Sequence, residues 1–441
     1  MKPETEASFW YRVARIAGAL RPRRRSVAPG PAVETPAGIS VVIPSRNGRD
    51  LLAAQLPGIV RELDRFPAEI IIVDNGSDDG TAEWLRSAWP QVSIEISAAP
   101  LSFARGVNRG IACARYSHVC LLNNDMLIEP NFFGALVRAF EQVPALFCAT
   151  AQIFFPAGVR REETGKAVYY QAGPADFPII CVEPIPGEDL TYVLYGSGGC
   201  SLYDAAKLRA LGNIDEAYEP AYVEDLDIGY RAWQRGWPSV YVDGARLEHR
   251  HRATSSRYFT EAQLDEILDV NYLRFLARAV ADREVFQKLW LQALTRLRIR
   301  AGLGAGARNA LRAAAGIALQ GGPQAASLFP EDLLLALAAG GITVFPGRSA
   351  LAAPRSLVAG SQPRPGAIVV SFVEKLETPP PELLDSCTEV VLVRRSDGPL
   401  AFRAALRLTA TKWRPEAAFL QGDEMAQFAG DCAPAHAITF R

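Results

Sequence analysis

The chain has 441 residues, of which 49% are hydrophobic, and its 47 lysines and arginines against 48 aspartates and glutamates give a formal net charge of −1. This length and composition allow about two or three domains with large cores, and the near-zero charge gives no reason to expect nucleic-acid binding. The seven cysteines are odd in number and contain no CxxC pair, which indicates a reduced, cytoplasmic protein rather than a disulfide framework or a zinc site.

Residues 1–37 are predicted to form a basic amphipathic segment and a Pro- and Gly-rich linker. Six arginines fall between residues 12 and 25 and interrupt the apolar stretch that a secretory signal needs. No apolar run approaches the roughly 20 residues that span a bilayer. Apolar side chains recur at helical spacing, at Phe9, Val13, Ile16, Ala17 and Leu20. Such a helix fits peripheral contact with an anionic membrane surface, and it equally fits docking on the protein itself.

From residue 39 the sequence alternates between apolar, β-branched runs and segments with helical spacing. The apolar runs predict four strands, which begin near residues 39, 69, 92 and 118. Strand and helix repeated at this spacing predict an α/β fold, a mostly parallel sheet flanked by helices. Pro57 lies in the first helical segment, where it predicts a helix boundary or a kink.

Polar clusters follow three of these strands, at 44–47, 74–77 and 123–125. In parallel α/β sheets, ligands bind beyond the carboxyl ends of the strands. Because these ends meet at one edge of the sheet, the three clusters predict one polar pocket there.

Six motifs in this region, taken in order, resemble those of family 2 glycosyltransferases of GT-A fold. They are VVIPSRNG, IIIVDNGSDDGT, ARGVNRGI, LLNNDMLIEP, GSGGCSLYDAAKLRALGNIDEAY and YVEDLDIGYRAWQRGW. The resemblance runs from about residue 39 to residue 280 and looks closest to the bacterial rhamnosyltransferase-like branch. It implies a glycosyltransferase domain over 38–260. It also implies a nucleotide-diphosphate sugar as donor and a glycan or lipid-linked acceptor, with work in cell-surface polysaccharide synthesis on the inner face of the cytoplasmic membrane.

The resemblance implies a donor site at the strand ends. Asp74 and Asn75 match the loop that holds the nucleobase and ribose, and Asn75 in place of a second Asp leaves the base open between uracil, thymine and guanine. Arg105 fits either a phosphate contact or a surface salt bridge. The remaining positions implied for the nucleotide sugar are Pro44, Ser45, Asn47, Asn108, Asn123, Asn124, Gly198 and Gly199. For the two glycines a tight strand bend is the alternative.

A divalent cation, Mg²⁺ or Mn²⁺, is the expected cofactor. Such a cation stabilises the charge that grows on a diphosphate leaving group, and it needs only one or two protein carboxylates. By resemblance, Asn123-Asn124-Asp125 stands where family members carry D-x-D, so Asp125 is the expected ligand. His249, with His251 as the alternative, matches a histidine that joins the metal or closes over the diphosphate. A solvated basic loop is the other interpretation of this segment.

Asp225 is the residue predicted to act as general base, with Glu224 beside it as helper or acceptor contact. Inverting transfer requires a carboxylate that removes the proton of the acceptor hydroxyl, and in the family the E-D pair opens a helix on the acceptor side. Acidic residues also favour helix N-termini, so a helix cap is the alternative. Asp227 lies four residues before Arg231, which predicts a structural ion pair.

The rest of the chain differs in character. Residues 261–325 carry long helical patterns and are predicted to form a helical extension. Residues 326–441 alternate strand and helix again after 365, and they partly resemble the N-terminal half of a family 4 GT-B glycosyltransferase. We expect a truncated, non-catalytic Rossmann-like domain. The competing function is a non-catalytic sugar-binding or scaffold protein of GT-A fold, which the Asn in place of the first Asp of D-x-D favours.

Overall fold

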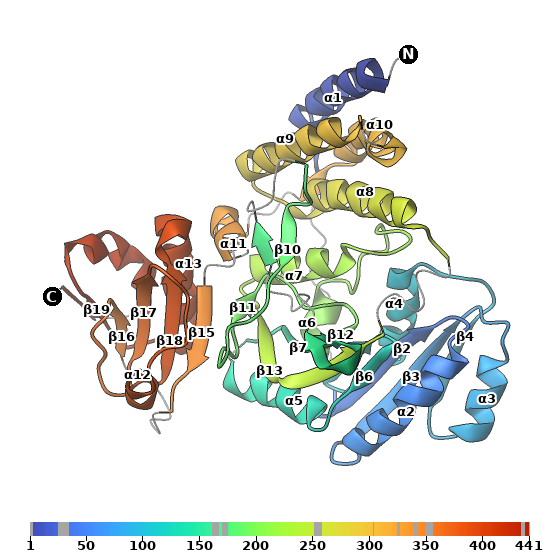
Figure 1. Cartoon of the computed structure of the whole chain (residues 1–441), viewed down its shortest axis with the longest axis horizontal. Helices are drawn as coiled ribbons and strands as arrows, with labels where there is room; N and C mark the ends of the chain where they lie inside the picture. Colours follow the sequence, from blue (N-terminus) through green and yellow to red (C-terminus); the bar gives the residue numbers. More distant parts are fainter. Residues whose placement is uncertain are drawn as a thin grey trace.

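The computed structural model describes residues 3–24, 35–143, 145–160, 167–169, 175–250, 258–302, 304–323, 327–337, 342–348, 356–433 and 437–440. Figure 1 shows a central α/β body, a layer of helices on one side of it and a second, smaller α/β body that holds the C-terminus. Within the described residues, no helix is both long and apolar enough to cross a bilayer.

The central sheet has ten strands, in the order β11-β13-β7-β12-β5-β2-β3-β4, with β6 paired to β13 and β8 to β7. The four predicted strands are β2 (Ile39–Ser45), β3 (Ala68–Asn75), β4 (Ser93–Ser97) and β5 (His118–Leu122), and they pair in parallel as expected. The remaining strands are β6 (Met126–Ile128), β7 (Cys148–Phe155), β8 (Val159–Arg160), β11 (Tyr192–Val193), β12 (Cys200–Asp204) and β13 (Ser239–His249). A separate hairpin pairs β9 (Ala167–Tyr169) with β10 (Ile179–Cys181).

Side chains of the parallel strands alternate between the two faces of the sheet, because the strand period is two residues. Val41 and Ile43 join the core beneath α2, whereas Val42 joins the core beneath α4. The helices of this body are α2 (Arg49–Leu63), α3 (Thr81–Ala88), α4 (Phe103–Cys113), α5 (Phe132–Gln142), α6 (Ala205–Ala210) and α7 (Glu224–Gln234). Pro57 lies inside α2 rather than at its boundary. The α/β fold with a mostly parallel sheet is therefore confirmed.

Four helices form the layer beside the central body: α1 (Pro3–Ala19), α8 (Glu261–Ala279), α9 (Arg283–Arg300) and α10 (Ala305–Leu319). α1 packs on α9 and α10, and a short parallel pair of β1 (Arg23–Arg24) and β14 (Gly322–Pro323) ties its end to this layer. The face of α1 that docks carries Ala7, Ala14 and Ala17, whereas Phe9, Ile16 and Leu20 are exposed. Of the predicted apolar face, only Ala17 is fully buried against the protein, and its larger members point outward.

The C-terminal body is a six-stranded sheet in the order β15-β18-β17-β16-β19-β20. Its elements are β15 (Ile342–Pro346), β16 (Ser356–Ala359), β17 (Ile368–Val373), α12 (Pro381–Ser386), β18 (Glu389–Arg394), α13 (Gly398–Trp413), β19 (Ala417–Leu420) and β20 (Ala437–Phe440). β15 is antiparallel to its neighbour, and the other strands are parallel. This is an α/β sheet of its own, with α13 crossing over it.

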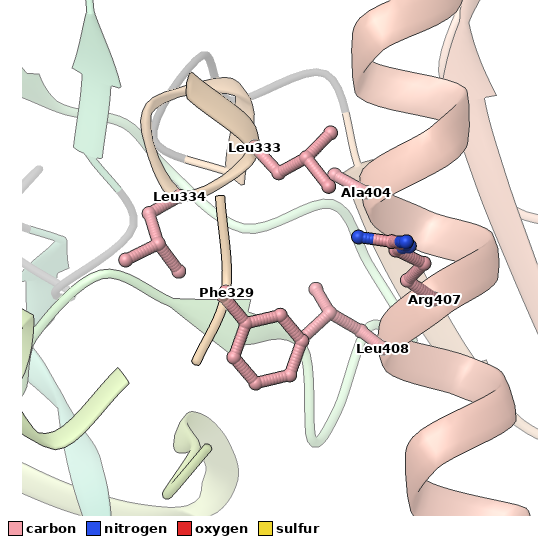
Figure 2. Close-up of a pocket in the computed structure, with 6 residues that line it drawn as sticks. All are labelled: Phe329, Leu333, Leu334, Ala404, Arg407 and Leu408. Carbon is pink, nitrogen blue, oxygen red and sulfur yellow. The ribbon is translucent and has the colours of Figure 1, made fainter. Parts of the chain in front are cut away.

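Polar and apolar contacts join the two α/β bodies. The amide of Val344 in β15 donates to Thr191 Oγ1 at 3.0 Å, and the amide of Asp189 donates to Val344 O at 3.2 Å. Between α11 (Glu331–Leu337) and α13, Figure 2 shows Phe329, Leu333 and Leu334 facing Ala404 and Leu408. The Phe329 ring also meets Trp233 of α7 edge-on, with 6.4 Å between centroids. The end of α7 is thereby in contact with the C-terminal body.

Candidate active site

The three polar clusters at the strand ends are linked to one another by hydrogen bonds. Asn124 Nδ2 donates to Ser45 Oγ at 2.9 Å, which ties the end of β5 to the end of β2. The Asn47 amide donates to Ser77 Oγ at 2.9 Å, and the Asp78 amide donates to Asn47 Oδ1 at 2.9 Å, which ties β2 to β3. The predicted convergence of these clusters at one edge is present in the structure.

Asp74 and Asn75 at the end of β3 differ in how far their side-chain polar atoms are already engaged within the protein. Asp74 is buried, and its Oδ1 accepts from the Ser77 amide at 3.1 Å. The Asn75 carboxamide is engaged on both sides by Leu101, donating to its carbonyl at 3.0 Å and accepting from its amide at 2.6 Å. This residue straps the loop after β4 to β3, a role that the sequence did not suggest.

Arg105 and Asn108 of α4 face the loop that precedes α7. Arg105 lies 3.3 Å from a Glu219 carboxylate oxygen and 3.6 Å from one of Glu216, with its side chain half exposed. Asn108 Nδ2 donates to Ile214 O at 2.8 Å. The salt-bridge alternative for Arg105 is therefore the arrangement in the structure, and its contact with a donor phosphate stays a prediction.

Asp125 and His249 meet at the candidate metal site. Asp125 follows β5 and is buried, and its Oδ2 lies 3.4 Å from Nε2 of His249 at the end of β13. The Arg250 amide donates to the main-chain oxygen of Asp125 at 2.9 Å, which fixes the register between the two segments. His251, the alternative ligand, lies outside the described residues.

The donor set at this point fits a divalent cation bound mainly through its substrate. One carboxylate and one imidazole are both acceptable ligands, and Mg²⁺ in phosphate-transfer sites commonly keeps one or two protein carboxylates with the rest from phosphate and water. Among the residues that the structure describes, no group of three or more His, Cys, Asp or Glu side chains is placed to hold a metal. Asp125 and His249 would thus be the protein's share of the ligands.

Gln55 of α2, which the sequence analysis missed, holds the turn of residues 123–126 that carries Asp125. It is almost fully buried, and its Nε2 donates to Asn123 O at 2.6 Å and to Met126 O at 2.7 Å. A glutamine on the apolar face of a helix with a full hydrophobic pattern is the only sequence sign of such a role. It indicates a buried polar group that needs partners.

Two adjacent glycines connect the candidate base to the turn of residues 123–126. The Gly198 amide donates to Asp225 Oδ2 at 3.3 Å, and the Asn123 amide donates to Gly199 O at 2.9 Å. A Cβ on Gly199 would lie 2.4 Å from Asn123 Nδ2, so only glycine permits this approach. The contact fits a tight strand bend as well as a site glycine, so the role of the two glycines toward the nucleotide sugar stays a prediction.

The two acids that open α7 lie in different environments. Asp225 is partly exposed, and its Oδ1 accepts from the Leu226 amide at 2.8 Å. Glu224 is buried, and its Oε2 has no hydrogen-bond partner in the part of the chain that the structure describes. Burial, followed by the neighbouring charge of Asp225, raises the pKa of Glu224 well above its ordinary value of 4.5. The pair therefore combines an accessible carboxylate with a carboxyl group that favours its neutral form.

Asp227 is structural, as its spacing from Arg231 predicts. Its carboxylate is buried, and Oδ2 lies 2.6 Å from Arg231 Nε, while Oδ1 accepts from Tyr218 Oη at 2.9 Å. Burial raises the pKa of Asp227 although the Arg231 charge opposes the shift. Arg231 also donates to Leu211 O at 2.6 Å. This ion pair fixes α7 to the loop after α6.

The loop that aims the two acids is held by α8. Tyr222 and Val223 adopt left-handed backbone angles, with φ of 74° and 77°, which is costly for residues other than glycine. Asn271 of α8, fully buried, donates from Nδ2 to Ala221 O at 2.8 Å and to Tyr222 O at 3.1 Å. No local pattern identified Asn271, because its partners lie about 50 residues away in the sequence.

Comparison with known protein families identifies one family for the central body. A sequence profile described as glycosyltransferase-like family 2 matches residues 36–263. The chain is 27% identical over 212 residues to an N-acetylglucosaminyl-diphospho-decaprenol L-rhamnosyltransferase of Mycobacterium tuberculosis, covering 43% of this chain and 68% of that protein. It is 26% identical over 230 residues to an uncharacterised protein of Sinorhizobium fredii. That match covers 49% of this chain and 25% of the length of the Sinorhizobium protein.

Two solved structures are similar to the chain at low sequence identity. The structure of GalNAc-T7 with UDP, GalNAc and Mn²⁺ has a TM-score of 0.44 at 18% identity, covering 59% of this chain and 53% of that one. The mannosyltransferase PcManGT of Pyrobaculum calidifontis, in complex with GDP-Man and Mn²⁺, has a TM-score of 0.41 at 13% identity, covering 69% and 88%.

Proposed function

The chain belongs to glycosyltransferase-like family 2, and on that premise we propose that it transfers a sugar from a nucleotide-diphosphate donor to a glycan or lipid-linked acceptor, with inversion. Asp225 is the proposed general base. The observation that supports this proposal is a pair of hydrogen bonds: the Gly198 amide donates to Asp225, and the Asn123 amide donates to the carbonyl of the adjacent Gly199. Asn123 lies two residues before Asp125, which pairs with His249. Acceptor activation and leaving-group stabilisation require such neighbouring sites.

Asp225 is suited to remove the proton of the acceptor hydroxyl. Its carboxylate is partly exposed, whereas Glu224 is buried with a raised pKa. Burial therefore favours the neutral form of Glu224 and leaves Asp225 as the better candidate for the base. Asp225 takes the proton as the acceptor oxygen attacks the anomeric carbon, a contribution of typically about 10²–10⁴-fold. Glu224 contacts the acceptor or holds the position of Asp225.

The donor is proposed to lie along the carboxyl ends of β2, β3 and β5. The buried Asp74 and the linked Ser45 and Asn124 supply polar groups for the nucleotide. Asp125 and His249 would hold the divalent cation, Mg²⁺ or Mn²⁺. When bound, it would stabilise negative charge on the diphosphate leaving group.

We place the acceptor on a lipid carrier, because a relative is a transferase whose name specifies an N-acetylglucosaminyl-diphospho-decaprenol acceptor. Work on a lipid-linked acceptor calls for peripheral contact with the inner face of the cytoplasmic membrane, as part of polysaccharide synthesis. The outward face of α1 supports this contact, since it exposes Phe9, Ile16 and Leu20 with Arg12 and Arg15 beside them. The seven free cysteines fit a reducing compartment.

Nucleotide binding is tested first, by thermal shift of the whole protein with UDP, dTDP and GDP, each with and without Mn²⁺. A ligand that binds the native state raises its stability by RT ln(1 + [L]/Kd), so one nucleotide should raise the melting temperature more in the presence of Mn²⁺. The Asp125→Asn variant should lose the Mn²⁺-dependent part. No shift with any nucleotide would contradict the enzyme proposal, and the preferred base would name the donor class.

Substitution of the base separates catalysis from binding. Asp225→Asn should keep the thermal shift with nucleotide and Mn²⁺, because the donor ligands are unchanged, and should lower the rate of sugar transfer by about 10²–10⁴-fold. Transfer is measured by release of the nucleoside diphosphate in the presence of acceptor. Turnover that survives in this variant would exclude Asp225 as the base. Nucleotide binding without turnover in the wild-type protein would favour the non-catalytic alternative.

A further inference from the structure

The C-terminal body has a cavity at its sheet edge that the transfer reaction does not use. Its volume is about 620 Å³, within the range of about 300–1,000 Å³ typical of small-molecule sites. It is lined by residues that follow β16, β18 and β19 and by Phe372 near the end of β17. All four strands are parallel, so the cavity lies at their common carboxyl edge.

This cavity lies at the point of the sheet where the order of the strands reverses direction. From β16 the chain runs outward through β17 and β18, and α13 then carries it back to β19 on the opposite side of β16. The loops after β16 and β19 therefore leave the sheet in divergent directions. In open α/β sheets, ligands bind in the crevice that forms at such a point.

The crevice is built to hold its shape. Gln421, after β19, clasps the loop after β16 by accepting from the Gln362 amide and donating to the Gln362 carbonyl, both at 2.9 Å. A Cβ on Gly360 would lie 2.4 Å from Gln421 Oε1, and Gly360 has φ of 149°, so glycine is required for the clasp. This arrangement leaves a fixed wall between the two divergent loops.

The charge of the lining favours an anion. Arg395 lies 3.2 Å from carboxylate oxygens of Glu374 and Glu424, so its charge is already compensated. Arg364 makes no salt bridge within the described part of the chain, and its guanidinium lies 3.5 Å from the centroid of the Phe419 ring. Stacking on a ring fixes the plane of a guanidinium and leaves its N–H groups for an oxyanion.

We propose that this cavity binds an anionic sugar, that is, a carbohydrate that carries a phosphate or carboxylate group. Arg364 takes the anion, and the amide and hydroxyl groups of the lining suit sugar hydroxyls. The Phe372 ring stacks on Phe402, with 4.1 Å between centroids, and the Arg395 guanidinium lies 5.0 Å from its centroid, so that the ring adds a fixed apolar edge to the lining. The proposal goes beyond the transfer reaction and does not depend on it.

Isothermal titration of the full-length protein tests the site with glucose 1-phosphate, glucuronate, glucose and inorganic phosphate. We expect saturable binding of one or both charged sugars and at least about tenfold weaker binding of glucose and of phosphate. The two charged sugars separate a phosphate source from a carboxylate source. Equal binding of glucose would overturn the role of charge, and equal binding of phosphate would overturn the carbohydrate assignment.

Variants locate the binding. Arg364→Gln should weaken the charged sugar by at least about tenfold, while Arg348→Gln, an exposed arginine of the same body paired with Asp385, should leave it unchanged. Asp125→Asn should also leave it unchanged, since that residue lies at the transferase site. Absence of saturable binding in the wild-type protein, or binding lost in Asp125→Asn and kept in Arg364→Gln, would overturn the proposal. A melting temperature of Arg364→Gln close to that of the wild-type protein shows that this variant is folded.

Discussion

At the scale of single residues, the buried carboxyl group of Glu224 lowers the stability of the folded protein at neutral pH. Its folded pKa is raised above 4.5 by burial, so the native state binds its proton more tightly than the unfolded chain does. Stability from this group is present below its unfolded pKa and is lost as the pH rises through the folded pKa. A residue that lowers stability in this way is better explained by a role in the active site than by a role in folding.

Glu224→Gln should therefore stabilise the protein at neutral and alkaline pH, because the amide replaces a carboxyl group that is costly to ionise when buried. Melting temperatures between about pH 4.5 and pH 8.5 measure the effect. We expect the gain over wild type to grow with pH, to a few degrees, and to vanish near the acid end. The exposed Glu83→Gln on α3, whose side chain is 76% exposed, is the matched control and should show no such trend. A gain that is constant or largest in acid would contradict this account.

Residues of the site could be predicted from the sequence only where their chemistry is local. Asp227 and Arg231 are one helical turn apart, and their ion pair follows from that spacing. Asn75 shares the motif that suggests a nucleotide contact, yet its carboxamide is engaged by Leu101, about 26 positions away. Residue type and spacing cannot report such a partner, because it depends on how the β4 loop folds back.

At the scale of elements, α8 acts as a brace for the start of α7. Asn271→Leu removes the donor that satisfies Ala221 O and Tyr222 O in a loop with unfavourable backbone angles. Leaving such groups unpaired costs about 1–3 kcal/mol, and the loop should relax away from the geometry that aims Asp225. We expect the transfer rate to fall by about tenfold or more, with nucleotide affinity unchanged.

The split between rate and affinity distinguishes positioning from a general loss of stability. Asn309→Leu is the matched control, because Asn309 of α10 donates to Glu266 at 3.1 Å, within the helical layer and remote from α7. This variant should transfer sugar at the wild-type rate. Equal loss of rate in both variants, or a loss of nucleotide affinity in Asn271→Leu, would argue against the brace.

The outward face of α1 carries the prediction for membranes. Ile16 and Leu20 are 59% and 67% exposed, and burial of such a side chain yields about 1.5–3 kcal/mol. The double variant Ile16→Gln and Leu20→Gln should bind vesicles of anionic phospholipid at least about tenfold less, by co-sedimentation. Ile96→Gln, an exposed apolar residue of β4, should bind as wild type does. Wild-type protein that stays in the supernatant at low salt would contradict the membrane proposal.

At the scale of the whole molecule, the central and C-terminal bodies share an apolar joint. The Phe329 ring meets the Trp233 ring of α7 edge-on. Figure 2 shows Phe329 beside Leu408 of α13. Leu408→Ala should lower the free energy of unfolding by about 2–5 kcal/mol. Combined with Phe329→Ala it should show a coupling of about 0.5–3 kcal/mol, measured by urea unfolding.

The control combines Phe329→Ala with Leu63→Ala, a buried residue of α2. The changes in unfolding free energy of these two substitutions should add within about 0.5 kcal/mol. Additivity between Phe329→Ala and Leu408→Ala would mean that the joint contributes nothing as a unit.

The fold was predictable where the hydrophobic period was clear. Apolar, β-branched runs identified β2 to β5 and their parallel pairing, and helical spacing identified α8 and α9. The placement of β12 between β5 and β7, antiparallel to both, was not predictable, since strand order depends on contacts between distant segments. The sequence did not predict β15 and β16 as strands, because they are only 5 and 4 residues long.

The hydrogen bonds from Asn271 to the loop before α7 also bear on how this enzyme is best cut for recombinant work. The family match ends at residue 263, the third residue of α8, so a fragment trimmed to that match would discard Asn271 together with most of the helix. Such a fragment could be purified and still be inactive, because the loop before α7 would lack its support. A negative activity assay on it would not show that the full-length enzyme is inactive. Gene boundaries for activity screening should therefore be drawn beyond α8, whose far face in turn packs on α10.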